Sequence, residues 1–110
     1  MPYDPELVER IRPELERLRF VEEKKMFGGI GWIIAGNMAA GAHHDGRLVI
    51  RCRREEYDSL LRQPGANPME HGGRRLVGWV LVDAEAISED ADLQRWVSIG
   101  TDFARSLPSK

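Results

Sequence analysis

The chain has 110 residues, of which 42% are hydrophobic and 31% are charged, and its formal net charge is −2. A chain of this length suits one domain, and its composition is that of a folded globular protein rather than a disordered one. The near balance of acidic and basic residues argues against a protein that coats nucleic acid nonspecifically, because such proteins carry an excess of Lys and Arg.

The first predicted element is an amphipathic helix that begins after Asp4. The Asp4 carboxylate can accept hydrogen bonds from free N–H groups of the first turn, and Pro5 is tolerated there. Pro13 is expected to kink this helix or split it, since proline donates no backbone hydrogen bond. The apolar face of the helix is predicted by the spacing of Leu7, Val8, Ile11, Leu15 and Leu18.

The segment "KKMFGGIGW" follows and raises the question of a phosphate-binding loop. Such loops need the first turn of a helix directly after the glycines, whereas the next residues here are β-rich and lead into a hairpin. We therefore predict a bend between two strands. A two-residue turn at Gly28-Gly29 would place Lys25 opposite Trp32 in the core, where an ammonium group is costly. We favour a three-residue turn, which pairs Met26 with Trp32 and leaves Lys25 and Phe27 on the other face.

The middle of the chain is predicted to form antiparallel strands joined by two-residue turns at Gly36-Asn37 and Asp45-Gly46, whose residues tolerate positive φ. Taken literally, these turns place Trp32 opposite Gly41, and Gly41 opposite Ile50. Because side chains alternate between the faces of a sheet, one face becomes the apolar core. The predicted core face comprises Ile30, Trp32, Ile34, Ala39, Gly41, His43, Leu48, Ile50 and Cys52. The predicted open face comprises Gly31, Ile33, Ala35, Met38, Ala40, Ala42, His44, Arg47, Val49, Arg51 and Arg53.

Beyond these strands, residues 54–62 are predicted to form a short helix, and Gly72-Gly73 is predicted to turn a hairpin that places Glu70 opposite Arg75. A strand at 76–82 and a final amphipathic helix complete the chain. The resulting order is α-β-β-β-β-α-β-α. It predicts an α+β fold, a two-layer domain in which an antiparallel sheet of about five strands has helices packed on one face.

No constellation of residues predicts a catalytic, cofactor-binding or metal site. His43 and His44 are the most metal-like pair, but neighbours in a strand point to opposite faces and are not expected to share an ion. Cys52 falls on the predicted core face, where an inert thiol is expected, and the serines lack the sharp strand-to-helix turn of a nucleophile. We therefore expect a protein that is not an enzyme and needs no cofactor, and an enzyme of unknown class is the remaining alternative.

The arginines of the predicted open face are the strongest indication of a binding surface. One interpretation is that they blunt the strand and pair with acidic residues nearby. The other is that, with apolar neighbours, they form a surface for a protein partner, which includes a second copy of this chain as a homodimer. Nucleic acid is the less favoured alternative for this surface. The candidate interaction surface comprises Lys25, Phe27, Ile33, Met38, Arg47, Arg51 and Arg53.

The sequence also predicts the compartment. With a single cysteine no internal disulfide can form, which favours a reducing environment. The N-terminus is charged throughout and lacks the apolar middle of a secretory signal. No apolar run approaches the ~20 residues needed to cross a bilayer. We expect a cytoplasmic protein that does not contact membranes.

Several segments, in their order and spacing, resemble the N-terminal domain of the TfoX/Sxy competence regulators. They are "KKMFGGIGW", "GNMAAGAHHDGRLVIR", "EEYDSLLRQPGANPM", "GWVLV" and "LQRWVSIGTDFARSLPSK". The resemblance as a whole spans nearly the whole chain, roughly from Tyr3 to Lys110. The more specific positions of this signature are Lys25, Met26, Phe27, Gly28, Gly78 and Trp79.

The resemblance implies a small α+β domain with helices packed on an antiparallel sheet. It also implies a link to DNA uptake and to competence gene expression, alongside a transcription activator. It supplies no catalytic motif, and its signature positions can serve packing as well as binding. Full-length regulators carry a second, helical domain. We expect residues 1–110 to form a single domain of the N-terminal type without that C-terminal domain.

Overall fold

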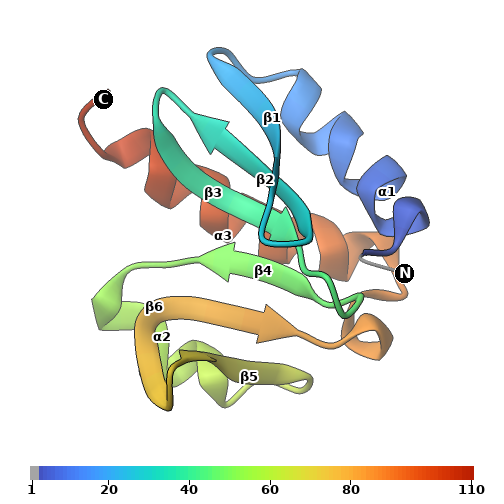
Figure 1. Ribbon diagram of the computed structural model, residues 1–110, viewed down its shortest axis with the longest axis vertical. Coiled ribbons are helices and arrows are strands. Elements are labelled where there is room, and N and C mark those ends of the chain that lie inside the picture. Colours follow the sequence, from blue (N-terminus) through green and yellow to red (C-terminus); the bar gives the residue numbers. More distant parts are fainter. Residues whose placement is uncertain (1–2) are drawn as a thin grey trace.

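The computed structural model describes residues 3–110, which fold into a sheet of six strands with helices against one face (Figure 1). The predicted α+β two-layer class is confirmed, with six strands in place of about five. In chain order the elements are α1 (Pro5–Glu16), β1 (Val21–Met26), β2 (Gly29–Ile34), β3 (Asn37–Ala42), β4 (Leu48–Arg51), α2 (Arg54–Leu61), β5 (Ala66–His71), β6 (Arg74–Val82), the 3-10 helix η1 (Ala84–Ile87) and α3 (Asp90–Ser106).

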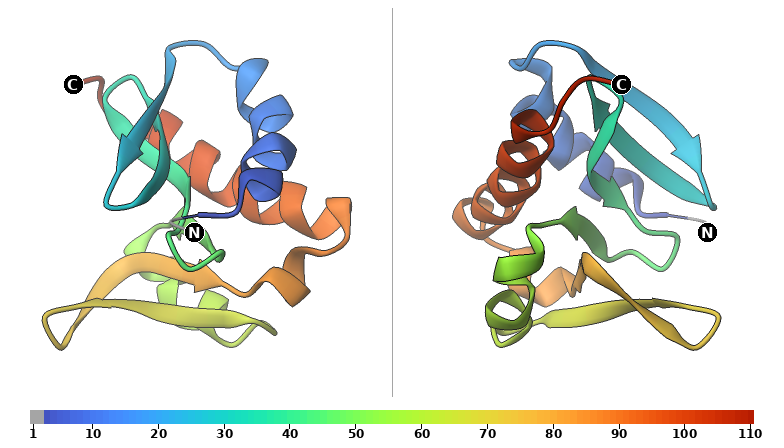
Figure 2. Two further views of the ribbon diagram at one scale, coloured as in Figure 1. Left: turned by 45° about the vertical axis from the view of Figure 1, so that its right-hand side comes forward. Right: turned by 90° about the vertical axis from the view of Figure 1, so that its left-hand side faces the viewer.

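The sheet is antiparallel throughout, in the order β1-β2-β3-β4-β6-β5. The extra strand, β5, forms a hairpin with β6 through Gly72-Gly73, and Glu70 lies opposite Arg75 as predicted. Helix α3 packs on β3 and β4, α2 packs on β6 and β5, and α1 packs against α3. The right-hand view of Figure 2 shows α2 and α3 on one side of the sheet, while the β1–β2 and β5–β6 hairpins project on the other.

The core lies between the sheet and the helices. Trp32, Ile50 and Val80 contribute from the strands, and Ile11 and Trp96 contribute from α1 and α3; all five are at most 1% exposed. Burying such large apolar side chains is the main favourable term in folding. Asp4 caps α1 as expected, through its carboxylate. The helix continues past Pro13 to Glu16 and is not split. None of the helices within residues 3–110 has the length and hydrophobicity to cross a membrane.

The turn between β2 and β3 is Ala35-Gly36, not the predicted Gly36-Asn37. Ala35 and Gly36 have φ of 50° and 88°, and Ile34 lies opposite Asn37. The reason is that Asn37 is needed in the strand: its buried side chain donates a hydrogen bond to the carbonyl of Pro108 (2.9 Å). Burying an amide in this way requires such a partner.

The turn between β3 and β4 also differs from the prediction by one residue. The N–H of His43 donates to the carbonyl of Arg47 (2.8 Å), and the N–H of Gly46 donates to the carbonyl of His43 (3.0 Å). Gly46 has φ of 92°, so this is a three-residue loop with a left-handed glycine rather than a two-residue turn. Consequently Ala40, rather than Gly41, lies opposite Ile50.

This slip exchanges the two faces of β3. Ala40 and Ala42 are in the core, where Gly41 and His43 were predicted to be. Ala39 is buried as predicted, because the register shifts between Trp32 and Ile33 and leaves it as an extra residue on β3. The faces predicted for β2 and β4 are correct, since their large apolar side chains occupy the core.

The β1–β2 turn is Phe27-Gly28, with φ of 49° and 76°, so both registers considered for it are wrong. A two-residue turn with positive φ at both positions matches the twist of the strands it joins. Met26 lies opposite Gly29, and Glu23 rather than Met26 lies opposite Trp32. Lys25 lies opposite Ile30 and is exposed at the sheet edge on the core side, so its predicted place on the open face is wrong.

Helix α3 crosses the sheet where β3 and β4 separate. A Cβ atom on Gly100 would lie 2.2 Å from the carbonyl oxygen of Ala39 and 3.6 Å from that of Arg51. The helix therefore rests on backbone atoms, which cannot move aside as a side chain can.

Gly100→Ala is expected to destabilise the protein by about 1–3 kcal/mol, because the added methyl group overlaps backbone. This outcome opposes helix propensity, which favours Ala over Gly by about 1 kcal/mol. Urea denaturation checks it, with Ser98→Ala on the exposed side of α3 as the control. A Gly100→Ala protein as stable as the parent would contradict this packing.

Arg12 of α1 and Glu23 of β1 join the helix to the sheet edge. Arg12 donates from Nε to Oε1 (2.9 Å) and from Nη2 to Oε2 (2.8 Å) of Glu23. Trp32 Nε1 donates to the same Oε1 at 3.1 Å. These hydrogen bonds, that of Arg12 foremost, lower the pKa of the Glu23 carboxyl below its usual value of 4.5, although partial burial acts in the opposite direction.

Glu23→Gln is expected to lower the free energy of unfolding at pH 7. This difference from the parent protein is expected to disappear in acid. A carboxyl whose pKa is lower in the folded state stabilises the fold above its unfolded pKa, near 4.5, and this stabilisation disappears as the pH falls through the folded value. Urea denaturation between pH 7 and pH 3 measures it, with the exposed Glu22→Gln as the matched control. An equal difference from the parent at every pH would refute the ionic role of Glu23.

Candidate binding groove on the open sheet face

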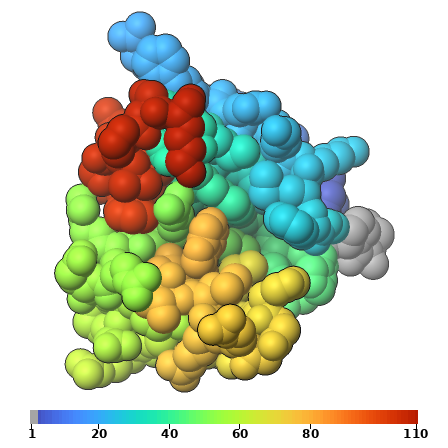
Figure 3. All heavy atoms as spheres, turned by 60° about the vertical axis from the view of Figure 1, so that its left-hand side comes forward, coloured from blue at the N-terminus to red at the C-terminus, as the bar shows by residue number. Residues whose placement is uncertain are grey.

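The face of the sheet that carries no helix holds a groove of about 510 Å³. We call it the sheet groove. Three hairpins border it: the β1–β2 tip, the β3–β4 turn and the β5–β6 hairpin (Figure 2). In Figure 3 the light-blue atoms near residue 25 and the yellow atoms near residue 70 lie on one face, with green atoms between them. The groove is lined by Met26, Phe27, Gly29, Ile30, Met38, Gly41, Ala42, His43, His44, Val49, Met69, Glu70, His71, Leu76 and Trp79.

Two glycines lie beneath the methionines that line the groove. Gly31 and Gly41 lie directly opposite each other on β2 and β3. A Cβ atom on Gly31 would lie 2.8 Å from Sδ of Met26 and 3.2 Å from Cε of Met38, and one on Gly41 would lie 3.1 Å from Cε of Met38. The methionines can therefore lie against bare backbone. A flat floor covered by flexible thioether side chains adapts to differently shaped apolar groups.

Aromatic side chains stand at two borders of the groove. Phe27, in the β1–β2 turn, is 93% exposed. Trp79 of β6 is half-buried and lies opposite Arg51 of β4. A large aromatic side chain that projects into solvent beside an apolar groove is typical of a contact surface, because its exposure is unfavourable until something covers it.

All three histidines of the sequence line this groove. The rings of His43 and His44 have their centroids 4.1 Å apart, so the argument that these residues point to opposite faces is wrong; His44 lies in a turn rather than a strand. Within residues 3–110, no group of three or more His, Cys, Asp or Glu side chains is arranged to hold a metal ion.

Arg47 is paired within its own turn. It donates from Nε and Nη2 to Oδ2 of Asp45, at 3.0 and 2.7 Å, and from its backbone N–H to Oδ1 at 3.1 Å. Nδ1 of His43 lies 2.8 Å from the same Oδ1, without the angle of a good hydrogen bond. Burial opposes the charge on Asp45, but the contacts with Arg47 and His43 outweigh it and hold the pKa of Asp45 well below its usual range. Arg47 is thus a structural cation.

Arg51 has a different environment. Its guanidinium carbon lies 5.5 Å from the centre of the Trp79 ring and 5.2 Å from the centre of the Phe103 ring. Arg53 also approaches Phe103, at 5.6 Å, and lies 4.0 Å from Glu56. Each cation–π contact contributes about 0.5–2 kcal/mol, according to how far it is shielded from water. The rings hold the Arg51 guanidinium in place beside the groove.

The structure gathers part of the predicted interaction surface. Phe27 and Met38 line the sheet groove, and Ile33 lies opposite Met38, half-buried on β2. Arg51 adjoins the groove through Trp79, whereas Lys25 is on the other side of the sheet edge. Whether this surface binds a partner stays a prediction.

The family signature positions fall on or near the groove. Met26, Phe27 and Trp79 line it, and Gly28 supplies positive φ in the β1–β2 turn. Gly78 has φ of 94°, and its carbonyl accepts a hydrogen bond from Cys52 (2.8 Å). These glycines shape the two hairpins that present the aromatic side chains.

Sequence reasoning missed the contribution of the β5–β6 hairpin to the site. Met69, His71 and Leu76 line the groove, but they come from a segment whose hairpin was predicted without a place in the sheet. The available signal was the Gly72-Gly73 turn, on either side of which Met69 and Leu76 stand three residues from the nearer glycine. Placing the hairpin next to β4 required the long-range pairing of Arg51 with Trp79.

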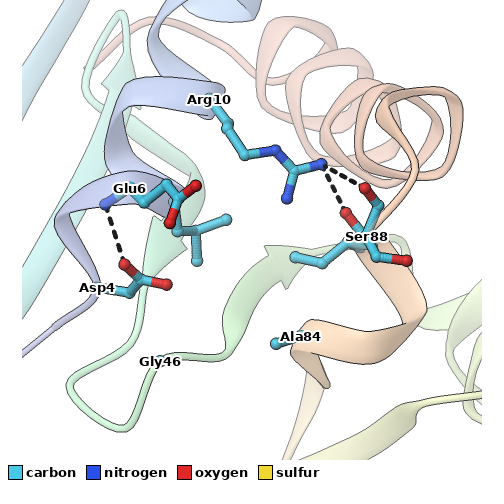
Figure 4. A pocket seen from close by; sticks show the side chains of 8 residues that line it. Asp4, Glu6, Arg10, Gly46, Ala84 and Ser88 are labelled. Atoms are coloured by element: carbon cyan, nitrogen blue, oxygen red, sulfur yellow. Dashed lines mark hydrogen bonds between the residues drawn. The ribbon is translucent and has the colours of Figure 1, made fainter.

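A second hollow, of about 310 Å³, lies between the start of α1, the β3–β4 turn and η1 (Figure 4). Its main polar group, Arg10, donates to the carbonyls of Ile87 (2.6 Å) and Ser88 (3.4 Å) and to Asp90 (3.2 Å). These bonds, all from Nη2, connect α1 to the end of η1 and to the start of α3, so this part of Arg10 serves the packing of the helices.

Cys52 is buried, and burial raises the pKa of its thiol to about 11, with a smaller effect from Glu56. A thiol of this kind is protonated at neutral pH and is a poor nucleophile. The groove on the open sheet face, rather than this residue or the hollow at Arg10, is therefore the best candidate for function.

No match was found among curated proteins or among solved structures. The family model of the TfoX N-terminal domain matches residues 14–104, a segment that runs from within α1 to the last turns of α3 and contains every strand that borders the groove. The chain therefore belongs to the TfoX N-terminal domain family.

Proposed function

We propose that this domain is a non-enzymatic interaction module in bacterial regulation, and that it binds a protein partner in the sheet groove. The observation that carries the proposal is an apolar groove, bordered by three hairpins, with Phe27 93% exposed at its edge. Protein-binding surfaces are enriched in aromatic residues and Met and depleted in charged residues at their centre. The sheet groove has this composition, with Glu70 as the one acidic residue among those that line it.

A role in binding rather than catalysis is supported by the chemistry of the groove. The polar side chains there are three histidines and one glutamate, and the His43 ring is directed to Asp45 of its own turn. A catalytic site needs an acid, a base and a reacting position at hydrogen-bonding distance from both. The apolar floor between Met26 and Met38 offers contact area instead.

A DNA-associated regulator that uses Arg47, Arg51 and Arg53 is the alternative function. The pairing of Arg47 with Asp45 and the proximity of Arg53 to Glu56 weaken it. Tracking a phosphate backbone requires several free cations at phosphate spacing, and each contributes to the salt dependence of binding. Of the three arginines, Arg51 alone has no carboxylate within 4 Å among residues 3–110.

Phe27→Ala is expected to weaken partner binding on the order of tenfold or more, because an exposed aromatic beside an apolar groove is the kind of residue that dominates binding energy. The measurement is affinity capture from a lysate of the source organism, quantified by mass spectrometry. Phe20→Ala is the matched control: Phe20 is 73% exposed, has positive φ as Phe27 does, and lies at the opposite end of β1.

Proteins retained by the native domain and by Phe20→Ala, and lost with Phe27→Ala, are the expected result. Light scattering on the same three proteins tests whether a second copy of the chain is the partner. Identical captured proteins for all three baits, together with a monomer in each case, would exclude the groove as the binding site.

A further inference from the structure

We infer that the segment bound in the sheet groove is an acidic, apolar stretch of polypeptide, with one of its carboxylates on the guanidinium of Arg51. The inference rests on the proposed function and adds to it the chemistry of the partner. It follows from the charges around the groove and from the way Arg51 is held.

Arg51 is a cation that the protein positions but does not neutralise. Its guanidinium lies over the rings of both Trp79 and Phe103, at 5.5 and 5.2 Å. Within residues 3–110 its side chain has no acceptor at hydrogen-bonding distance and no carboxylate within 4 Å. Contact with two rings restricts the guanidinium while its N–H donors have no partner among the described residues, so a carboxylate can bind to two N–H groups with little further loss of entropy.

The hairpin tips around the groove add unpaired positive charge. Arg74 and Arg75 are exposed beside the turn of the β5–β6 hairpin, and Lys24 is exposed beside the turn of the β1–β2 hairpin. None of these three has a carboxylate within 4 Å in the part of the chain that the structure describes. Exposed charges of one sign at a rim select an oppositely charged partner and accelerate its association.

The floor between these cations selects apolar side chains. Met26, Met38 and Met69 are three of the four methionines in the sequence, and all three line the groove with Trp79. Methionine-rich surfaces bind apolar groups of varied shape, because the thioether side chain has several accessible rotamers. An occupant therefore needs apolar groups for the floor and negative charge for the rim, which a peptide of mixed acidic and apolar residues provides.

A nucleic acid provides the negative charge for the rim but not the apolar groups for the floor. Its bases can stack on Phe27 and Trp79, but its backbone needs cations along the groove. The floor is apolar, and no Lys or Arg is among the residues that line the groove to contact successive phosphates.

The inference is tested with a displayed library of random peptides of about 12 residues, long enough when extended to cross a molecule 31 Å wide. The native domain is immobilised, enriched peptides are synthesised, and their dissociation constants are measured by fluorescence polarisation. Enrichment of peptides that combine Asp or Glu with Leu, Ile, Phe or Trp is expected. Peptides enriched in Lys or Arg, or lacking any acidic residue, would overturn the inference.

Arg51→Gln is expected to weaken the selected peptides about tenfold, the loss typical of one hydrogen-bonded charge pair. Replacing the acidic residue of the peptide by its amide is expected to cause the same loss on the native domain and no further loss on Arg51→Gln. The peptide change needs no altered protein, so it remains decisive if Arg51→Gln folds poorly. Arg62→Gln, at the exposed end of α2, is the matched control and leaves binding unchanged.

Phe27→Ala separates failure of this inference from failure of the proposed function. Some peptides could lose binding on Phe27→Ala but bind Arg51→Gln as tightly as they bind the native domain. That result would support the groove as the binding site and would overturn the inference that the partner is acidic. If the peptides bind Phe27→Ala as tightly as the native domain, or if no peptide is enriched, both the proposed function and this inference are overturned. The binding of duplex DNA is measured in parallel. Salt-dependent binding that Arg51→Gln abolishes would overturn the inference and identify nucleic acid, rather than an acidic peptide, as the partner.

Discussion

The left-handed backbone of Gly46 is the constraint on which the rest of the sheet depends. With φ of 92° it completes a three-residue loop, in which the carbonyl of Arg47 accepts from His43, and this loop sets the register of β3 on β4. A two-residue turn would shift β3 by one position and exchange its faces. The observed register sends Ala40 and Ala42 toward the helices and turns Gly41 outward. The core and the groove are thus two consequences of the same loop.

Small side chains on both faces of β3 bring its backbone close to everything that packs on it. On the core side, the carbonyl of Ala39 lies where a Cβ atom of Gly100 would be, so α3 rests almost directly on the strand. On the open side, Gly41 faces Gly31, and the methionines lie on bare backbone. A larger residue on either face would move α3 or fill the groove. The thin centre of the sheet is therefore what makes an apolar hollow compatible with a closely packed core.

The sequence predicts the class of this fold better than its registers. The Asp4 cap, the Gly72-Gly73 turn and the apolar faces of β2 and β4 are each encoded by local chemistry, and each is observed. The strand "NMAAGA" carries no such asymmetry, because Ala and Gly fit either face and leave the turn to decide. The β2–β3 turn that precedes this strand depends on a distant contact. This contact is the hydrogen bond from the buried side chain of Asn37 to the carbonyl of Pro108, and the residues next to the turn do not reveal it.

The same limit applies to the candidate site, where Arg47 and Arg51 appear equivalent in the sequence. Both are on the strand predicted to carry the arginine stripe, and both were expected to face solvent together. The structure distinguishes them by their surroundings: Asp45, two residues away, neutralises Arg47, whereas Trp79 and Phe103, from β6 and α3, hold Arg51 without neutralising it. A charge paired inside its own turn is already satisfied and has little to gain from a partner. A charge held beside aromatic rings retains its N–H donors, so the recognition that we propose for this surface depends on the contact of three distant elements rather than on the number of arginines along one strand.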